Sequence, residues 1–120
     1  MSSMAREITG DALVHHLPAD AMTIDLALLV RHGRSARTLV KQGPLRLTLM
    51  ELAKGALLPT HRAEGPISIH VLRGRVLFTA AERSYPLAPG DVLVLAAGVE
   101  HAAQSESGAL FLLSVVHQDS

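Results

Sequence analysis

Residues 67–79 read ISIHVLRGRVLFT, and this stretch decides the fold class. From Ile67 to Val71, branched apolar side chains alternate with other residues. An alternation with a period of two is typical of a β-strand that buries one of its two faces. The apolar run resumes after Arg73-Gly74, a pair that favours a tight turn. We therefore expect two strands joined at this point by a hairpin.

The same strand pattern extends in both directions from this stretch. Leucine occupies every second position of residues 45–49, which predicts a half-exposed strand. A turn is expected at residues 81–82, and residues 88–91 have the proline and glycine of a type II turn. Residues 91–95 and 109–116 are apolar enough for buried strands. Many short strands separated by regular turns predict an all-β sandwich or closed barrel.

The N-terminal part of the chain has a helical pattern instead. A short helix is predicted over about residues 21–32, with Asp20 as its N-cap and Gly33 as its C-terminal stop. One apolar stripe runs along it, formed by Met22, Leu26, Leu29 and Val30. The chain has 120 residues, which allows one domain. We divide this domain into an N-terminal arm with the short helix, residues 1–35, and a barrel, residues 36–120.

The composition excludes several classes of function. The 11 basic and 11 acidic side chains give a formal net charge of zero, which argues against nucleic acid as a partner. The chain has no cysteine, so disulfides, thiolate metal sites and a thiol nucleophile are excluded. No secretory leader or membrane-length apolar run is recognised, so we expect a cytoplasmic protein without a membrane partner.

Two spaced motifs make the barrel segment similar to a known family. The matching residues are Gly55, His61 and Gly74 in the first motif and Gly90, Gly98 and His101 in the second. This segment resembles the cupin family, whose motifs are G-x5-H-x-H-x3,4-E-x6-G and G-x5-P-x-G-x2-H-x3-N. The resemblance spans residues 55–105 and implies a cupin-type β-barrel or jelly roll. It also implies a homodimer, because small cupins commonly pair.

The chain departs from the family pattern at four positions. Metal-binding cupins resemble one another in using three histidines and one glutamate on inward-facing positions. Of these four ligands the chain keeps His61 and His101. The substituted positions are Ala63 for the second histidine, Ile67 for the glutamate, Ala96 for the proline and Ser105 for the asparagine.

A metal site would need a further ligand. Sites for zinc, iron, manganese or nickel usually take three or four protein ligands, and His61 and His101 are two. His70 and Glu64 are the candidates for a third. Position 67 faces inward in the family, so strand alternation predicts that His70 points outward unless a β-bulge intervenes. Glu64 follows His61 in a loop and could swing toward it.

Two readings from different classes therefore stay open for the barrel. In the first, the protein binds a small molecule without a full metal site, in a pocket lined by His61, Ala63, Ile67 and His101. Isoleucine in place of the glutamate makes this pocket more apolar. Arg62, beside the pocket mouth, could hold an anionic group by bidentate hydrogen bonds.

In the second, the protein is a metal-dependent cupin enzyme of the dioxygenase or isomerase type, using His61 and His101 with a third ligand. A third reading is a dimerisation unit without its own chemistry. The metal content and the response to small organic ligands separate these readings.

Overall fold

The computed structural model describes residues 11–17 and 25–117. Within these residues the chain forms one short helix and nine strands. They are α1 (Leu26–His32), β1 (Arg34–Gln42), β2 (Leu45–Leu52), β3 (Ala56–His61), β4 (Ile67–Gly74), β5 (Val76–Ala80), β6 (Arg83–Leu87), β7 (Val92–Leu95), β8 (His101–Ser105) and β9 (Ala109–Val116).

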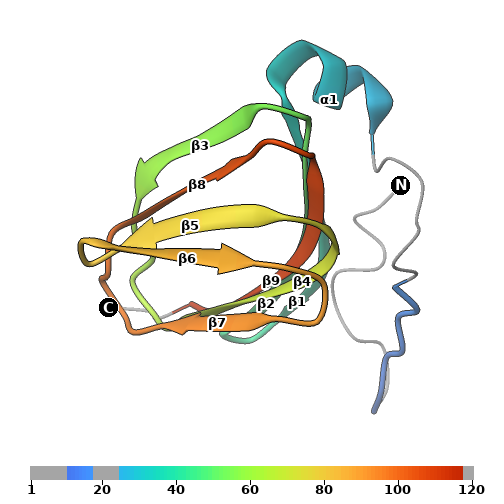
Figure 1. The fold of residues 1–120 in the computed structure, drawn as a ribbon. Coiled ribbons are helices and arrows are strands. Elements are labelled where there is room, and N and C mark those ends of the chain that lie inside the picture. The colour runs from blue at the N-terminus through green and yellow to red at the C-terminus, as the bar shows by residue number, and fades with distance from the viewer. Residues whose placement is uncertain (1–10, 18–24, 118–120) are drawn as a thin grey trace.

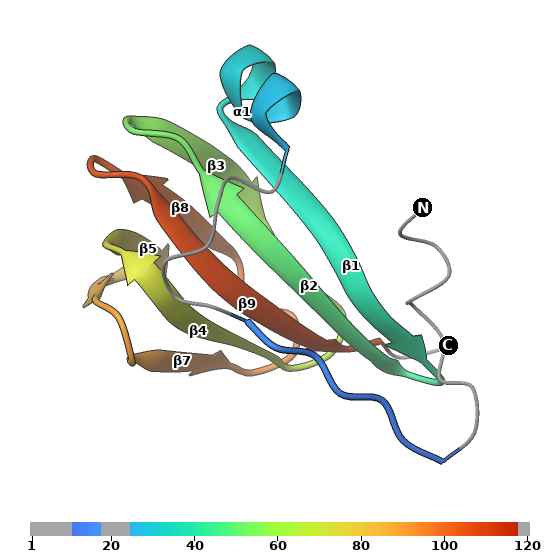
Figure 2. The same ribbon diagram turned by 90° about the vertical axis from the view of Figure 1, so that its right-hand side faces the viewer.

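The strands form two antiparallel sheets that face each other (Figures 1 and 2). The larger sheet has the order β1-β2-β9-β4-β7, and the smaller one has the order β3-β8-β5-β6. Strands that are neighbours in a sheet are mostly distant in sequence, as in a jelly roll. The expected all-β barrel or jelly roll with a short N-terminal helix is confirmed. No helix of the described residues is long and apolar enough to cross a membrane.

The main core lies between the two sheets. Alternating side chains of β4 point into it, so Ile69 and Val71 are 0% exposed, as the period-two pattern predicted. Phe78 of the smaller sheet meets Phe111 of the larger one edge to face, with ring centroids 5.8 Å apart. This aromatic pair links the two layers near the centre of the core.

A second apolar cluster covers the outside of the larger sheet. It consists of Leu39, Val40, Leu49 and Leu110, and partly buried leucines pack against it. Leu17 is one of these leucines, and the segment 11–17 runs across the outside of this sheet (Figure 2). Strand β9 is therefore buried on both of its faces at this level.

The helix is shorter than the sequence pattern predicted. It begins after Asp25, whose carboxylate accepts a hydrogen bond from the backbone N–H of Leu28 at 3.1 Å. Gly33 caps its end as expected, with a φ of 76°. The predicted N-cap, Asp20, lies outside the described residues.

The expected hairpin at Arg73-Gly74 is wrong. Strand β4 belongs to the larger sheet and β5 to the smaller one, so the chain crosses between layers here instead of folding back. Gly74 has a φ of 76°, and a Cβ at this position would overlap the carbonyl oxygen of Gly108. Glycine is needed because the crossing brings two backbones into direct contact.

The two other expected turns are present. Ala81 and Glu82 connect β5 to β6 with φ values of 51° and 64°, so this is a two-residue hairpin turn with both central residues left-handed. The turn at residues 88–91 is closed by a hydrogen bond of 2.9 Å from the Asp91 N–H to the Ala88 carbonyl. Strand β7, expected to be buried, instead exposes Val92 and Val94 because it is an edge strand.

Candidate functional site

The structure brings His61 and His101 together. His61 is the last residue of β3 and His101 is the first of β8, and the two are cross-strand partners. Their ring centroids lie 4.7 Å apart, with an angle of 67° between the ring planes. An irregularity in the β3–β8 register between Leu58 and His61 precedes this pair. We call these two side chains the histidine pair.

The protonation of His101 follows from its hydrogen bond. Its Nδ1 lies 3.1 Å from the carbonyl oxygen of Val99. A carbonyl oxygen only accepts, so Nδ1 must donate and carry the proton. In the neutral ring Nε2 is then a hydrogen-bond acceptor with a free lone pair. The ring of Phe78 lies beside His101, with centroids 6.2 Å apart.

His61 favours its neutral form. Burial lowers the pKa of His61 below its ordinary value of 6.5, and the nearby charge of His101 lowers it further. The ring nevertheless stays exposed to solvent at the rim of the barrel. At neutral pH we therefore treat His61 as an uncharged imidazole that can donate one hydrogen bond and accept another.

The histidine pair lines one end of a cavity of about 250 Å³, which we call the rim cavity. The other walls come from both sheets and are mainly apolar. The complete lining is Arg34, Met50, Leu58, Pro59, His61, Phe78, His101, Ala102, Ala103, Phe111 and Leu113. An apolar space with a few polar groups at its edge is the usual form of a small-molecule site.

Arg34 is a member of this lining that sequence reasoning missed. It is the first residue of β1 and is paired with Leu52 of β2. The sequence analysis placed it in the N-terminal arm, directly after the helix stop at Gly33, where nothing indicated a pocket. Only the pairing of β1 with β2 places it beside the cavity, and such pairing between strands cannot be read from spacing.

The other residues predicted for the pocket lie elsewhere. Ile67 is 4% exposed and belongs to the main core, between Leu95 and Val115 on the neighbouring strands. Ala63 packs against the same core. Arg62 is exposed in the loop after β3. None of the three contributes to the lining of the rim cavity.

The two candidates for a third metal ligand are also separate from the histidine pair. The register of β4 is regular up to Val71, so strand alternation holds at His70 and places it on the outer face of the larger sheet. Glu64 is exposed in the loop between β3 and β4. In the described part of the chain, no three histidine, aspartate or glutamate side chains gather where they could hold a metal ion.

The donor set thus fits a resident metal poorly. Two imidazoles would leave a divalent transition metal short of the three or four protein ligands that such sites usually have. The two other ligand positions of the family hold Ala63 and Ile67, whose side chains have no lone pair.

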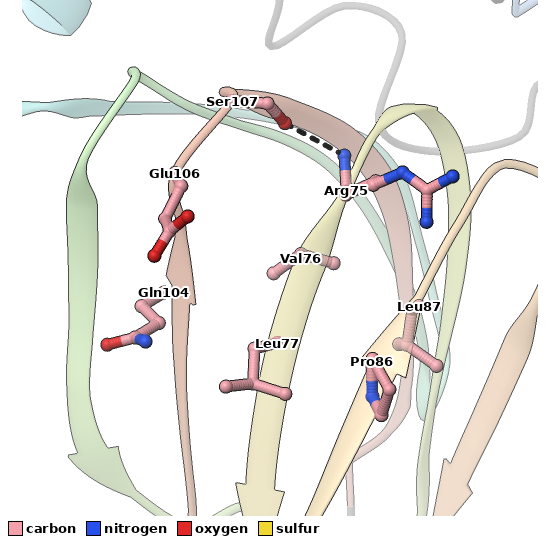
Figure 3. A pocket seen from close by; sticks show the side chains of 8 residues that line it. All are labelled: Arg75, Val76, Leu77, Pro86, Leu87, Gln104, Glu106 and Ser107. Carbon is pink, nitrogen blue, oxygen red and sulfur yellow. Dashed lines mark hydrogen bonds between the residues drawn. The ribbon is translucent and has the colours of Figure 1, made fainter.

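A separate hollow of about 260 Å³ lies against strands β5, β6 and β8 of the smaller sheet (Figure 3). Leu77 and Pro86 form its floor, with Gln104 and Glu106 at one side. The backbone N–H of Arg75 donates to the Ser107 hydroxyl at 3.2 Å. No imidazole lines this hollow, whereas both histidines line the rim cavity, so we place the candidate site there.

Two facing antiparallel sheets with a cavity between them define a small β-barrel protein of the jelly-roll type. The model of the cupin domain family matches residues 48–116, and the chain therefore belongs to the cupin family. No match is found among curated proteins.

Solved structures similar to the chain share its fold. A conserved protein of unknown function from Streptococcus pyogenes is 25% identical, with a TM-score of 0.70, and the match covers 93% of this chain and 100% of that one. A cupin 2 conserved barrel domain protein from Leptotrichia buccalis is 27% identical, with a TM-score of 0.66, over 69% of this chain and 40% of that one. A cupin superfamily protein from Desulfitobacterium hafniense is 20% identical, with a TM-score of 0.68, and the match covers 71% of this chain and 78% of that one.

Proposed function

We propose that this cupin binds a small organic molecule in the rim cavity and does so without a resident metal ion. The observation that carries the proposal is the cavity itself. Its volume of about 250 Å³ lies just below the usual range for ligand pockets, about 300–1,000 Å³, so a small ligand is expected. The lining combines an apolar body with two imidazoles at one end.

The driving force for binding would come from the apolar walls. Met50 and Leu113 contribute from the larger sheet, and Phe78 contributes from the smaller one. Each Å² of apolar surface removed from water stabilises the complex by about 25 cal/mol before the costs of association are subtracted. The histidine pair then supplies direction, because a ligand hydroxyl or amide can donate to the lone pair of His101 Nε2.

The proposal is tested by a screen of small neutral and charged aromatic and branched aliphatic compounds, read by thermal shift and by NMR. Leu113→Phe fills the cavity from a half-buried position. Leu57→Phe makes the same change on the exposed outer side of β3 and serves as the matched control. We expect compounds that bind the unmodified protein and the control Leu57→Phe but no longer bind Leu113→Phe. Hits that both variants bind equally would place binding outside the cavity and contradict the proposal.

A metal-dependent enzyme is the second candidate. One observation favours it, namely the two imidazoles whose centroids lie 4.7 Å apart. A metal there would need the substrate or water to complete its coordination. Elemental analysis of protein purified without chelator decides between the two. Near-stoichiometric zinc, iron, manganese or nickel that His61→Ala removes would establish this candidate and overturn the metal-free proposal.

A further inference from the structure

We propose that the molecule held in the rim cavity is a small organic anion with an apolar body, and that Arg34 binds its charged end. This inference rests on the proposed function and deepens it by naming the class of ligand. It is carried by the position of Arg34, by the charge of the cavity lining and by the hydrogen bond that fixes His101.

Arg34 lies on the inner side of its strand. Its partner on β2 is Leu52, which is 1% exposed and belongs to the main core. Two residues further along, Ala36 pairs with Met50, another member of the cavity lining. Cross-strand partners project to the same face, so the arginine stem starts on the inner face of an edge strand. The residue as a whole is exposed to solvent.

No group of the described residues neutralises this guanidinium. The lining of the cavity contains no aspartate or glutamate. In the part of the chain that the structure describes, the side chain of Arg34 has no ion-pair or hydrogen-bonding partner. Arginine stays charged at any physiological pH, so the cavity has one fixed positive charge beside apolar walls. Such a field attracts an anion and repels a cation.

Neutral His101 does not compete for the anionic group. His101 uses its Nδ1 proton on the carbonyl of Val99, so its remaining nitrogen accepts hydrogen bonds. A carboxylate also only accepts, and it gains nothing from that lone pair. Neutral His61 can offer a carboxylate one uncharged N–H, whereas Arg34 offers a charged planar fork that fits it with two hydrogen bonds, so the charged end of the ligand is expected at Arg34.

The size of the cavity limits the apolar body. An apolar cavity of about 150 Å³ admits benzene. The rim cavity, at about 250 Å³, has room for one six-membered ring and a carboxylate. Phe78 and Phe111 line it and offer ring faces and edges to an aromatic guest.

Three probes of nearly the same shape separate charge from shape, namely benzoate, benzamide and benzamidine. Each is titrated into the full chain and followed by two-dimensional NMR. We expect benzoate to bind about tenfold more tightly than benzamide, and benzamidine most weakly, because hydrogen bonds to a charged group are the stronger ones. Shifts should centre on the cavity lining. Raising the salt concentration should weaken the binding of benzoate and leave the binding of benzamide unchanged.

Two variants assign the charge effect to one residue. Arg34→Gln should abolish the preference for benzoate, and Arg34→Lys should restore part of it. Arg62→Gln, which removes an exposed arginine outside the cavity, is the control and should keep the preference. Equal binding of benzoate and benzamide, or a preference that survives Arg34→Gln, would overturn this inference and leave the proposed function standing. If none of the three probes binds in the cavity, the inference fails, and the proposed function is decided by the wider screen described above.

Discussion

Gly74 shows most clearly how a single residue constrains the barrel. Its φ is 76°, and the carbonyl oxygen of Gly108 occupies the space that a side chain would need. We expect Gly74→Ala to lower the free energy of unfolding by about 2 kcal/mol or more beyond the cost of the left-handed backbone alone. Urea denaturation measures this difference.

Gly90→Ala is the matched control for that change. Gly90 has a φ of 94°, but nothing lies within 4 Å of a Cβ built there. In the control, the free energy of unfolding should therefore fall only by the cost of a left-handed backbone at alanine, about 1–3 kcal/mol. If both variants lost the same amount, the close contact with Gly108 would not matter for stability.

His61 gives the protein a dependence on pH. Its pKa is lowered in the folded protein, first by burial and then by His101, so folding favours the neutral ring. Between that lowered pKa and about 6.5, the unfolded chain binds more protons than the folded one. We therefore expect stability to decrease as the pH falls from about 6.5 through the folded pKa. Denaturation curves measured across this pH range test the expectation. In His61→Gln, stability should decrease less as the pH falls, and in His16→Gln, an exposed control, it should decrease as much as in the unmodified protein.

The second cause of that shift can be tested on its own. His101→Gln removes the charge that opposes protonation of His61 while keeping a polar side chain. The pKa of His61 should rise toward 6.5, and only the effect of burial should remain. An NMR titration of the His61 ring measures this. An unchanged pKa would mean that the two rings do not interact electrostatically.

At the residue scale, the sequence could predict part of the candidate site. His61 and His101 stand at fixed distances from motif glycines, so their convergence followed from the resemblance. Arg34 could not be predicted, because its place depends on the pairing of an edge strand with β2. Ile67 was expected in the pocket, and the structure places it deeper, in the main core. Alternation predicts which face of a strand a side chain is on, but not how far along the barrel that side chain lies.

Strand β9 has fully buried side chains on both of its faces. Phe111 points into the main core, and Leu110 points into the outer cluster at 0% exposure. We expect Leu110→Ala to lower the free energy of unfolding by about 3 kcal/mol, although it lies outside the barrel. Leu57→Ala, on a strand face that is 62% exposed, should change it by less than about 0.5 kcal/mol. Similar small losses in both, measured by urea denaturation, would mean that the outer cluster is loosely packed.

The positions of most strands were readable from the period-two pattern, but their sheet membership was not. Arg73-Gly74 looked like a hairpin because two apolar runs flank a glycine. The same signal also fits a crossing between layers, and the choice depends on contacts with Gly108, 34 positions away from Gly74. Residues 81–82 were predicted correctly, because a two-residue hairpin depends only on local conformation.

For the whole molecule, the exposed face of β7 bears on self-association. Val92 and Val94 are 56% and 66% exposed on the outer side of the larger sheet. Neighbouring apolar side chains at the surface often mark an interface. We expect a homodimer that the double substitution Val92→Thr, Val94→Thr weakens, because threonine keeps the β-branched shape and adds a hydroxyl. Analytical ultracentrifugation measures the association, and a chain that is monomeric at all concentrations would contradict the expectation.

The overall architecture was the most predictable level. The motif glycines and histidines together indicated a cupin, and the family match over residues 48–116 confirms it. The motifs fix turns and strand ends, and the apolar alternation between them fixes which faces meet, so the barrel follows without knowledge of any single contact.

The two sheets share no strand, and no hydrogen-bonded ladder joins their edge strands β1 and β3. Separating the layers on this side would leave every ladder intact and would cost mainly the contacts between opposing side chains. Arg34 of β1 and Leu58 of β3 both stand at this margin, beside the rim cavity. Any opening of the barrel on this flank would therefore disrupt packing between side chains and spare the hydrogen-bonded framework of each layer.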